Sequence, residues 1–168
     1  SGESHNCGLN MDGEVICWGG NTYGESSPPS TTLRYIDSGA YFSCGLNDIG
    51  GVLCWGYNGY GIVSSMPSGS FIQLAVGPYH ACVLDATGSI TCWGSDSHGQ
   101  VSQTPTGTFT QVFTGVAFTC ALDADNTLSC WGGPGYNLAT TPPVGRYQTA
   151  ALGAGFGCAI DFNGEIDC

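Results

Sequence analysis

The sequence predicts an all-β fold, a β-propeller of about five small antiparallel blades built from 38-residue repeats. Ten cysteines form five pairs with the spacing C-x9-C, and the pairs recur every 37 or 38 residues. A fixed period of this length is typical of arrays in which each unit packs mainly on its neighbours. The 28 glycines and 8 prolines suit short strands and tight turns, and no stretch has the 3.6-residue apolar period of a helix.

The chain is expected to form one propeller domain, with an incomplete last blade. Five C-x9-C segments are followed by only four connecting segments, because the fifth pair ends at Cys168. The ring can close with one lean blade, the chain can be a fragment, or its open ends can pair with another copy. We expect a five-bladed ring that is closed or nearly closed. The domain spans 1–168, and the repeats run approximately over 2–38, 39–76, 77–114, 115–152 and, in part, 153–168.

Each C-x9-C segment is predicted to be a β-hairpin with a three-residue loop. An Asp or Asn stands three positions after the first cysteine, and Gly or Asn stands six positions after it. Asx at the start and Gly at the fourth place is the preference of a type I turn. Gly or Asn also suits the left-handed residue of a G1 bulge. The turns therefore begin at Asn10, Asn47, Asp85, Asp123 and Asp161, and they end at Gly13, Gly50, Gly88, Asn126 and Gly164.

The apolar pattern supports this register and predicts one disulfide in each blade. With the loop closed as described, the residues two positions inside the cysteines face each other, and all are aliphatic: Leu9/Val15, Leu46/Val52, Leu84/Ile90, Leu122/Leu128 and Ile160/Ile166. The two cysteines face each other on the same side of the strands, on a rung where side chains approach closely. The predicted bridges are Cys7–Cys17, Cys44–Cys54, Cys82–Cys92, Cys120–Cys130 and Cys158–Cys168.

Metal binding is the alternative role for these cysteines. Zinc ligand pairs usually have two to four intervening residues rather than nine, so we expect disulfides and no metal or other cofactor. Each bridge closes a short loop and adds roughly 3 kcal/mol at most. Oxidised cysteines at this density predict a secreted protein in an extracellular or equivalent compartment.

A Trp-Gly pair follows the second cysteine in four repeats. These tryptophans are expected to fill the core between blades. A turn-rich segment that can add a fourth strand comes next, then a proline-bearing loop and a short strand that ends at a glycine just before the next hairpin. The structural tryptophans are Trp18, Trp55, Trp93 and Trp131, and the glycines are Gly39, Gly77, Gly115 and Gly153.

The charge balance excludes two classes of partner. There are 13 acidic residues, two arginines and no lysine, which gives a formal net charge of −11. Nucleic-acid backbones and anionic membrane surfaces are bound through clustered Lys and Arg, so neither is expected as a partner. No run approaches the length of a membrane span. No nucleophile elbow, phosphate loop or paired-His metal motif is present, so we expect no enzyme and no catalytic residue.

Aromatic residues in the turn-rich segments are the candidate ligand-binding residues. They stand six positions after the second cysteine, and on one propeller surface they can stack on sugars or bind proteins; loop packing is the alternative. His5 and His80 occupy a place filled by Phe in three repeats, which indicates packing rather than catalysis. The turn-starting Asx residues can also suggest calcium, but their turn role explains them without a metal. The candidate ligand-binding residues in the turn-rich segments are Tyr23, Tyr60, His98 and Tyr136.

The repeat resembles that of the regulator of chromosome condensation repeat family, in its secreted, cysteine-paired branch, as in plant crinkly-type receptor ectodomains. The likeness covers essentially the whole chain and includes Gly77, His80, Cys82, Leu84, Asp85, Gly88, Ile90, Cys92, Trp93, Gly94, Asp96, Gly99 and Gln100. It implies a β-propeller whose work is protein or ligand binding. The action of the founding nuclear members on a small GTPase and chromatin does not carry over, because this chain is acidic and rich in cysteine pairs.

We therefore expect a secreted, non-enzymatic propeller module that binds a protein or glycan through its loops. The first alternative is a structural subunit of an extracellular assembly or filament, which self-associates through incomplete terminal blades. The second alternative is a secreted enzyme inhibitor, for which no residue of this chain provides specific support.

Overall fold

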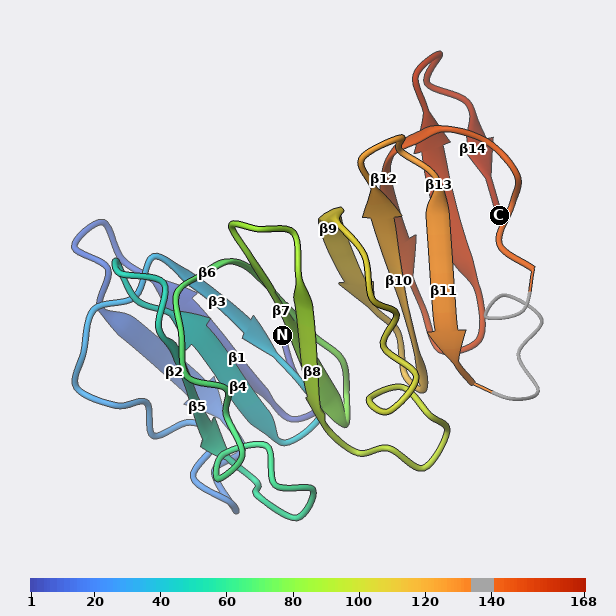
Figure 1. The fold of residues 1–168 in the computed structure, drawn as a ribbon. Helices are drawn as coiled ribbons and strands as arrows, with labels where there is room; N and C mark the ends of the chain where they lie inside the picture. The colour runs from blue at the N-terminus through green and yellow to red at the C-terminus, as the bar shows by residue number, and fades with distance from the viewer. Residues whose placement is uncertain (134–140) are drawn as a thin grey trace.

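The computed structural model describes residues 1–133 and 141–168, and within them the fold is all-β. Five antiparallel sheets follow one another in chain order, and we call them blades 1 to 5 (Figure 1). The described ranges contain no helix, and so none that is long and apolar enough to cross a membrane. Blade 1 is β1 (His5–Leu9) and β2 (Val15–Gly19); blade 2 is β3 (Tyr35–Ser38), β4 (Phe42–Leu46) and β5 (Val52–Gly56); blade 3 is β6 (Phe71–Val76), β7 (His80–Asp85) and β8 (Ile90–Gly94); blade 4 is β9 (Phe109–Thr114), β10 (Phe118–Asp123) and β11 (Leu128–Gly132); blade 5 is β12 (Tyr147–Leu152), β13 (Gly157–Asp161) and β14 (Ile166–Asp167).

The hairpin register is the one that the sequence predicts. In blade 3, Cys82 pairs with Cys92 and Leu84 with Ile90, and the other hairpins repeat this arrangement of aliphatic rungs. The Asp85 carboxylate accepts hydrogen bonds from the backbone N–H groups two and four residues later, which fixes the turn. Asn126 has a φ of 64° where the other repeats have glycine, as expected for an Asn in a left-handed position.

All ten cysteines lie in the described ranges and form five disulfides, one in each hairpin. Their Cα atoms are 4.0–4.1 Å apart, the close approach of rungs without backbone hydrogen bonds. The predicted one-bridge-per-blade pattern is therefore confirmed.

The linking strand before each hairpin becomes the first strand of the next blade. β6, for example, pairs with β7, and the turn between them contains Gly77. Blade 1 has two strands, and β14 of blade 5 has two residues.

The fourth strand that the sequence allows does not form in the described connecting segments, which are turns, bends and irregular chain, with an isolated bridge between Thr32 and Glu14. In the segment after β5, the Asn58 side-chain oxygen accepts hydrogen bonds from the N–H groups of Val63 and Ser64. In the segment after β8, the Asp96 carboxylate accepts the equivalent hydrogen bonds from the N–H groups of Val101 and Ser102. Side chains of this kind compete with a strand ladder for the backbone donors.

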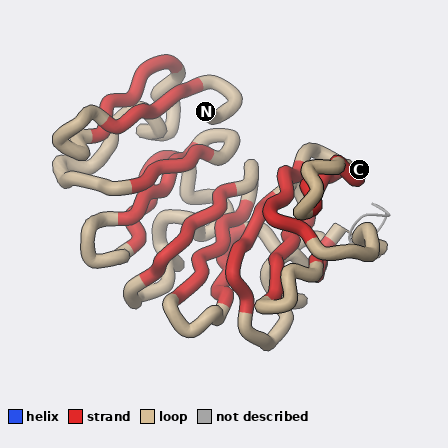
Figure 2. Tube along the Cα trace, turned by 90° about the horizontal axis from the view of Figure 1, so that it is seen from above, coloured by secondary structure: helices blue, strands red, loops and turns tan. Residues whose placement is uncertain are grey.

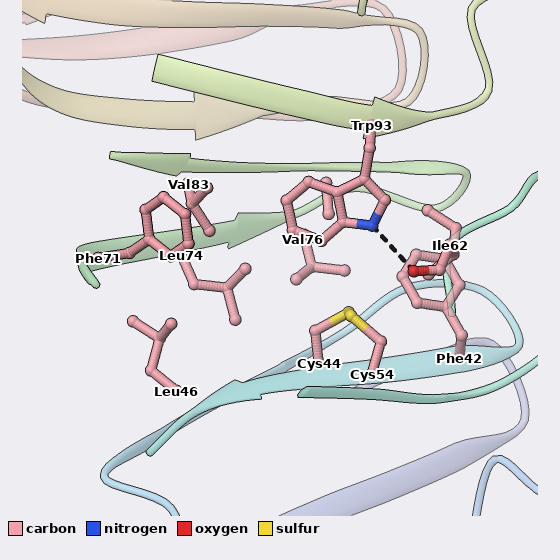
Figure 3. Packing of buried hydrophobic residues seen from close by; sticks show 11 residues of the cluster. Phe42, Cys44, Leu46, Cys54, Ile62, Phe71, Leu74, Val76, Val83 and Trp93 are labelled. Atoms are coloured by element: carbon pink, nitrogen blue, oxygen red, sulfur yellow. Dashed lines mark hydrogen bonds between the residues drawn. A yellow bond between two sulfur atoms is a disulfide. The ribbon is translucent and has the colours of Figure 1, made fainter. Parts of the chain in front are cut away.

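The core lies between blades, where the disulfide face of one blade packs on the tryptophan face of the next. Figure 3 shows the Cys44–Cys54 disulfide and Phe42 of blade 2 against Val76 and Trp93 of blade 3. The Trp93 indole N–H donates to the Ile62 carbonyl at 2.9 Å. Trp55 and Trp131 make the same bond to carbonyls of the preceding repeat, and all three tryptophans are buried.

The two outer faces of the array are exposed, so the blades form an open arc rather than the nearly closed ring that we expect from the sequence (Figure 2). In blade 1, Ile16 and Trp18 are 56% and 57% exposed; they lie on the strand face opposite the Cys7–Cys17 disulfide, whose Cys7 Sγ contacts Ser43 of blade 2. In blade 5, Phe156 and Ile166 are 63% and 66% exposed. Trp18 therefore does not fill an inter-blade core, unlike the other three tryptophans.

The aromatic position two residues before each first cysteine is buried in blades 1 to 4. His5 donates to or accepts from the Ser43 hydroxyl at 2.7 Å, and His80 makes the same contact with Thr119 at 2.8 Å. Phe42 and Phe118 occupy the equivalent place. The two histidines thus pack as interior aromatic groups, as their alignment with phenylalanine predicts.

Candidate functional site

Five tyrosines form a continuous row on one surface of blades 1 to 3. Neighbouring rings meet edge to face, with centroids 5.7 Å apart for Tyr23–Tyr41, 4.9 Å for Tyr23–Tyr57, 5.9 Å for Tyr57–Tyr60 and 5.8 Å for Tyr60–Tyr79. Edge-to-face contact is a favourable geometry for aromatic pairs. The row borders a concavity of about 250 Å³, which we call the tyrosine groove; it is lined by Tyr23, Tyr41, Phe42, Tyr57, Tyr60, Pro78 and Tyr79.

Two kinds of loop supply the five rings. Tyr41 and Tyr79 lie in the turns β3–β4 and β6–β7, three residues before the first cysteine of their hairpins. Tyr23, Tyr57 and Tyr60 lie in the connecting segments that follow β2 and β5. Because the blades pack in chain order, the turn of one repeat lies beside the connecting segment of the preceding repeat.

Backbone hydrogen bonds hold the two kinds of loop together. The N–H of Tyr57 donates to the carbonyl of Tyr41 at 2.9 Å, and the N–H of Ala40 donates to the carbonyl of Pro78 at 3.2 Å. The first bond joins a turn to its connecting segment, and the second joins the turns of blades 2 and 3. The groove is therefore built on paired backbone rather than on free loop tips.

The connecting segments are also held by hydrogen bonds to buried groups. Glu25 is buried, and its carboxylate accepts a hydrogen bond from the backbone N–H of Tyr23 at 2.7 Å. The Glu25 carbonyl accepts the Trp55 indole N–H at 3.0 Å. The loop that carries Tyr60 is held in the same way by the Trp93–Ile62 bond. These contacts fix the backbone of the loops that carry Tyr23 and Tyr60.

All five tyrosines are at least partly exposed. Tyr23, Tyr60 and Tyr41 are 50%, 47% and 36% exposed, and Tyr57 and Tyr79 are half-buried. A hydrogen bond to Glu3, together with the charge of that carboxylate, raises the pKa of Tyr41. The described lining contains no charged side chain; the exposed Glu3 and the buried Glu25 lie next to it.

The structure brings together two of the four predicted ligand-binding residues, Tyr23 and Tyr60. His98 is exposed, hydrogen-bonds the Ser97 hydroxyl at 2.8 Å and does not line the groove. The row stops before it because the next turn carries Ala117 where the earlier turns carry Tyr41 and Tyr79. Tyr136 lies outside the described residues.

Tyr41, Tyr57 and Tyr79 are groove residues that were not predicted from the sequence. The available signal was the tyrosine three positions before the first cysteine in two successive repeats. Its meaning depends on the neighbouring blade, because each ring belongs to the groove only through contact with a ring of another loop.

In the described part of the chain, no group of three or more His, Cys, Asp or Glu side chains is arranged to hold a metal ion. The turn-starting carboxylates are used locally. The hydroxyl and N–H of Thr127, for example, hydrogen-bond Asp123 and lower the pKa of its carboxyl.

Solved structures with the same fold include plant receptor ectodomains. The ectodomain of the Physcomitrella patens receptor kinase CR4 is 25% identical, with a TM-score of 0.83, over 96% of this chain and 48% of its own. The ectodomain of the Arabidopsis thaliana receptor kinase ACR4 is 24% identical, with a TM-score of 0.78, over 98% and 60%. Human WBSCR16 is 18% identical, with a TM-score of 0.77, over 98% and 59%. The chain thus spans about half to three fifths of the length of these proteins, and no curated protein matches its sequence.

The family comparison agrees with the repeat pattern, the disulfides and the blade architecture. The model of the regulator of chromosome condensation (RCC1) repeat matches four segments, 1–25, 34–62, 71–100 and 109–137, which together make up more than half of the chain. The structural neighbours are propellers of the same type. This chain, with one disulfide in each of its five hairpins, therefore belongs to the RCC1 repeat family.

Proposed function

We propose that this propeller is a secreted, non-enzymatic binding module that engages a protein or glycan through the tyrosine groove. The observation that carries the proposal is the row of five tyrosines, partly exposed and fixed by backbone hydrogen bonds. Tyrosine offers a large contact area and a polar hydroxyl at a low cost in side-chain entropy, which suits it to recognition surfaces.

Two further observations support an extracellular setting. The chain has five disulfides. Disulfides persist in oxidising compartments and are rare in reducing ones. Two of the structural neighbours are receptor-kinase ectodomains. A rigid, disulfide-linked array that carries an exposed aromatic groove fits the work of a recognition domain in such a compartment.

The test is a binding screen with matched variants. The purified chain is applied to arrays of extracellular protein domains and of glycans, alongside the variant Tyr23→Ala/Tyr60→Ala and the control Tyr35→Ala. Tyr35 is 44% exposed but lies on β3, outside the groove. Loss of the groove rings is expected to weaken each genuine hit by about tenfold or more, whereas the control leaves it unchanged. Hits that survive the double variant would refute the groove as the binding site.

A second candidate function is a subunit of an extracellular assembly, favoured by the exposed outer faces of blades 1 and 5. Trp18 stands where Trp55, Trp93 and Trp131 are buried against a preceding blade. Phe156 and Ile166 lie on the disulfide face, which packs on a following blade elsewhere in the chain. Head-to-tail stacking of two copies would bring these faces together, and such contacts build filaments when they do not close.

Self-association is tested by light scattering over a wide concentration range. The assembly proposal expects the particle mass to rise with concentration and Trp18→Glu to abolish the rise. A wild-type chain that stays monomeric at the highest concentration contradicts it.

A further inference from the structure

The lining of the tyrosine groove has an unusual composition for a general binding site. Its seven residues are five tyrosines, Phe42 and Pro78. No amide, carboxylate or guanidinium side chain is among them. The chemistry on offer is therefore flat apolar ring surface with phenolic hydroxyls at the ring tips.

This chemistry matches a polyproline II helix. Such a helix has three residues per turn and no internal hydrogen bonds, so its carbonyls need outside donors. Aromatic-lined grooves bind proline-rich segments of this kind, and the stiffness of the helix keeps the entropy cost low. The edge-to-face order of the rings, with neighbours at interplanar angles of 63–77°, makes ridges and slots rather than one flat stacking surface.

Neutral glycans need something that the lining does not provide. A sugar presents many hydroxyls, each both donor and acceptor, and pockets fix such polar ligands with a few precisely placed polar groups. Phenolic hydroxyls are the only side-chain polar groups of the described lining. The row is also bent by its edge-to-face contacts, so that no two successive rings are parallel platforms for stacked sugars.

The negative charge of the protein favours positively charged residues beside the part of the ligand that lies in the groove. Glu3 lies beside Tyr41 at one end of the row, and the chain as a whole has a formal net charge of −11. An acidic surface repels sulfated or carboxylated ligands and attracts cationic ones. Arginine or lysine beside the prolines therefore completes the complementarity.

From the lining, the ring geometry and the charge, we propose that the tyrosine groove binds an extended proline-rich peptide flanked by basic residues. This inference rests on the proposed binding function and names its ligand class. The rings cradle the prolines, the hydroxyls of Tyr23 and Tyr60 donate to the peptide carbonyls, and Glu3, which accepts from Tyr41, meets a flanking cation.

The test uses three synthetic peptides of equal length and measures dissociation constants by calorimetry. The probe is a run of L-proline with an arginine at each end; one comparison peptide replaces the prolines with Gly-Ser, and the other replaces the arginines with glutamates. The probe is expected to bind about tenfold tighter than the Gly-Ser peptide, and the glutamate ends are expected to weaken binding several-fold in a salt-dependent way.

Variants assign the binding to the groove. Tyr57→Ala/Tyr60→Ala is expected to weaken probe binding by about tenfold or more, and Tyr35→Ala serves as the control outside the groove. Because the alanine variant also removes ring contacts, Tyr23→Phe/Tyr60→Phe is measured as well. It keeps the rings and removes two hydroxyl donors, so a loss of about three- to tenfold is expected.

Two results overturn the inference. One is equal affinity for the proline and Gly-Ser peptides, or no binding of the probe at about 1 mM. The other is probe binding that ignores the groove variants. If neutral oligosaccharides bind through Tyr57 and Tyr60 while the peptides do not, the peptide ligand is wrong and the groove remains a binding site.

Discussion

Protonation of His80 is predicted to destabilise the interface between blades 3 and 4. The ring is fully buried, its Nε2 lies 2.8 Å from the Thr119 hydroxyl, and its Nδ1 has no hydrogen-bond partner among the described residues. Burial lowers the pKa of His80 from 6.5 to about 4, because the charged form loses its hydration. The folded protein therefore keeps this ring neutral at a pH where the unfolded chain protonates it.

The sign and size of the effect follow from that gap. Below pH 6.5 the unfolded state binds more protons than the folded state, so the free energy of unfolding falls as the pH falls from 6.5 towards 4. Each tenfold difference in proton affinity is worth about 1.4 kcal/mol, so the full loss attributable to His80 is about 3 kcal/mol.

The chain itself suggests the matched variant. Each buried histidine faces a hydroxyl of the following blade: His5 of blade 1 faces Ser43 of blade 2, and His80 of blade 3 faces Thr119 of blade 4. In the repeats that have phenylalanine at this place, the facing position is Ala or Gly. His80→Phe/Thr119→Ala therefore copies an existing inter-blade contact and removes the titrating group together with its partner.

The assay is urea unfolding at pH 7, 6, 5 and 4.5 with the disulfides intact. The difference in unfolding free energy between wild type and the double variant cancels the carboxylates and His5, which both proteins share. Wild type is expected to lose about 2 kcal/mol more than the variant between pH 7 and 4.5. Parallel losses in the two proteins would refute the reasoning.

Three further predictions concern stability and are checked by the same urea measurements at pH 7. Trp93→Ala is expected to cost about 3–5 kcal/mol because the ring is buried, whereas Trp18→Ala costs less than about 1 kcal/mol in the monomer; equal losses would contradict the inter-blade core. Removal of one bridge by Cys82→Ala/Cys92→Ala is expected to cost about 2–3 kcal/mol, and an unchanged midpoint would contradict its role. Gly88→Ala is expected to cost about 1–3 kcal/mol, since φ is +85° and a Cβ would lie 2.6 Å from a neighbouring side chain; a neutral result would show that the turn relaxes.

The hairpins were predictable because their determinants are local. A disulfide, an Asx turn and an aliphatic rung all lie within the eleven residues of one C-x9-C segment, and the alternation of strand faces relates them. Five repeats of the same pattern then supported a single register. The lack of a fourth strand in the described connecting segments is also local in origin, because the Asn58 and Asp96 side chains accept hydrogen bonds from backbone N–H groups that a strand would need.

The tyrosine groove was predictable only in part. Tyr23 and Tyr60 share a place in the repeat, so their common surface could be predicted from the sequence. Tyr41 and Tyr79 join them because the turn of one blade lies beside the connecting segment of the preceding blade. That neighbour relation is a property of packing between repeats, which the spacing of one repeat does not contain.

The sequence by itself determined the all-β class, the hairpin register and the five disulfides, because these depend on short-range geometry repeated along the chain. Only the tertiary structure decided which tryptophan remains exposed, that the arc is open, and that five tyrosines from separate loops meet in one groove. The physical reason is that burial and ring contacts depend on the angle between successive blades and on which of their faces meet. Those quantities are set by side chains up to 39 residues apart in the chain.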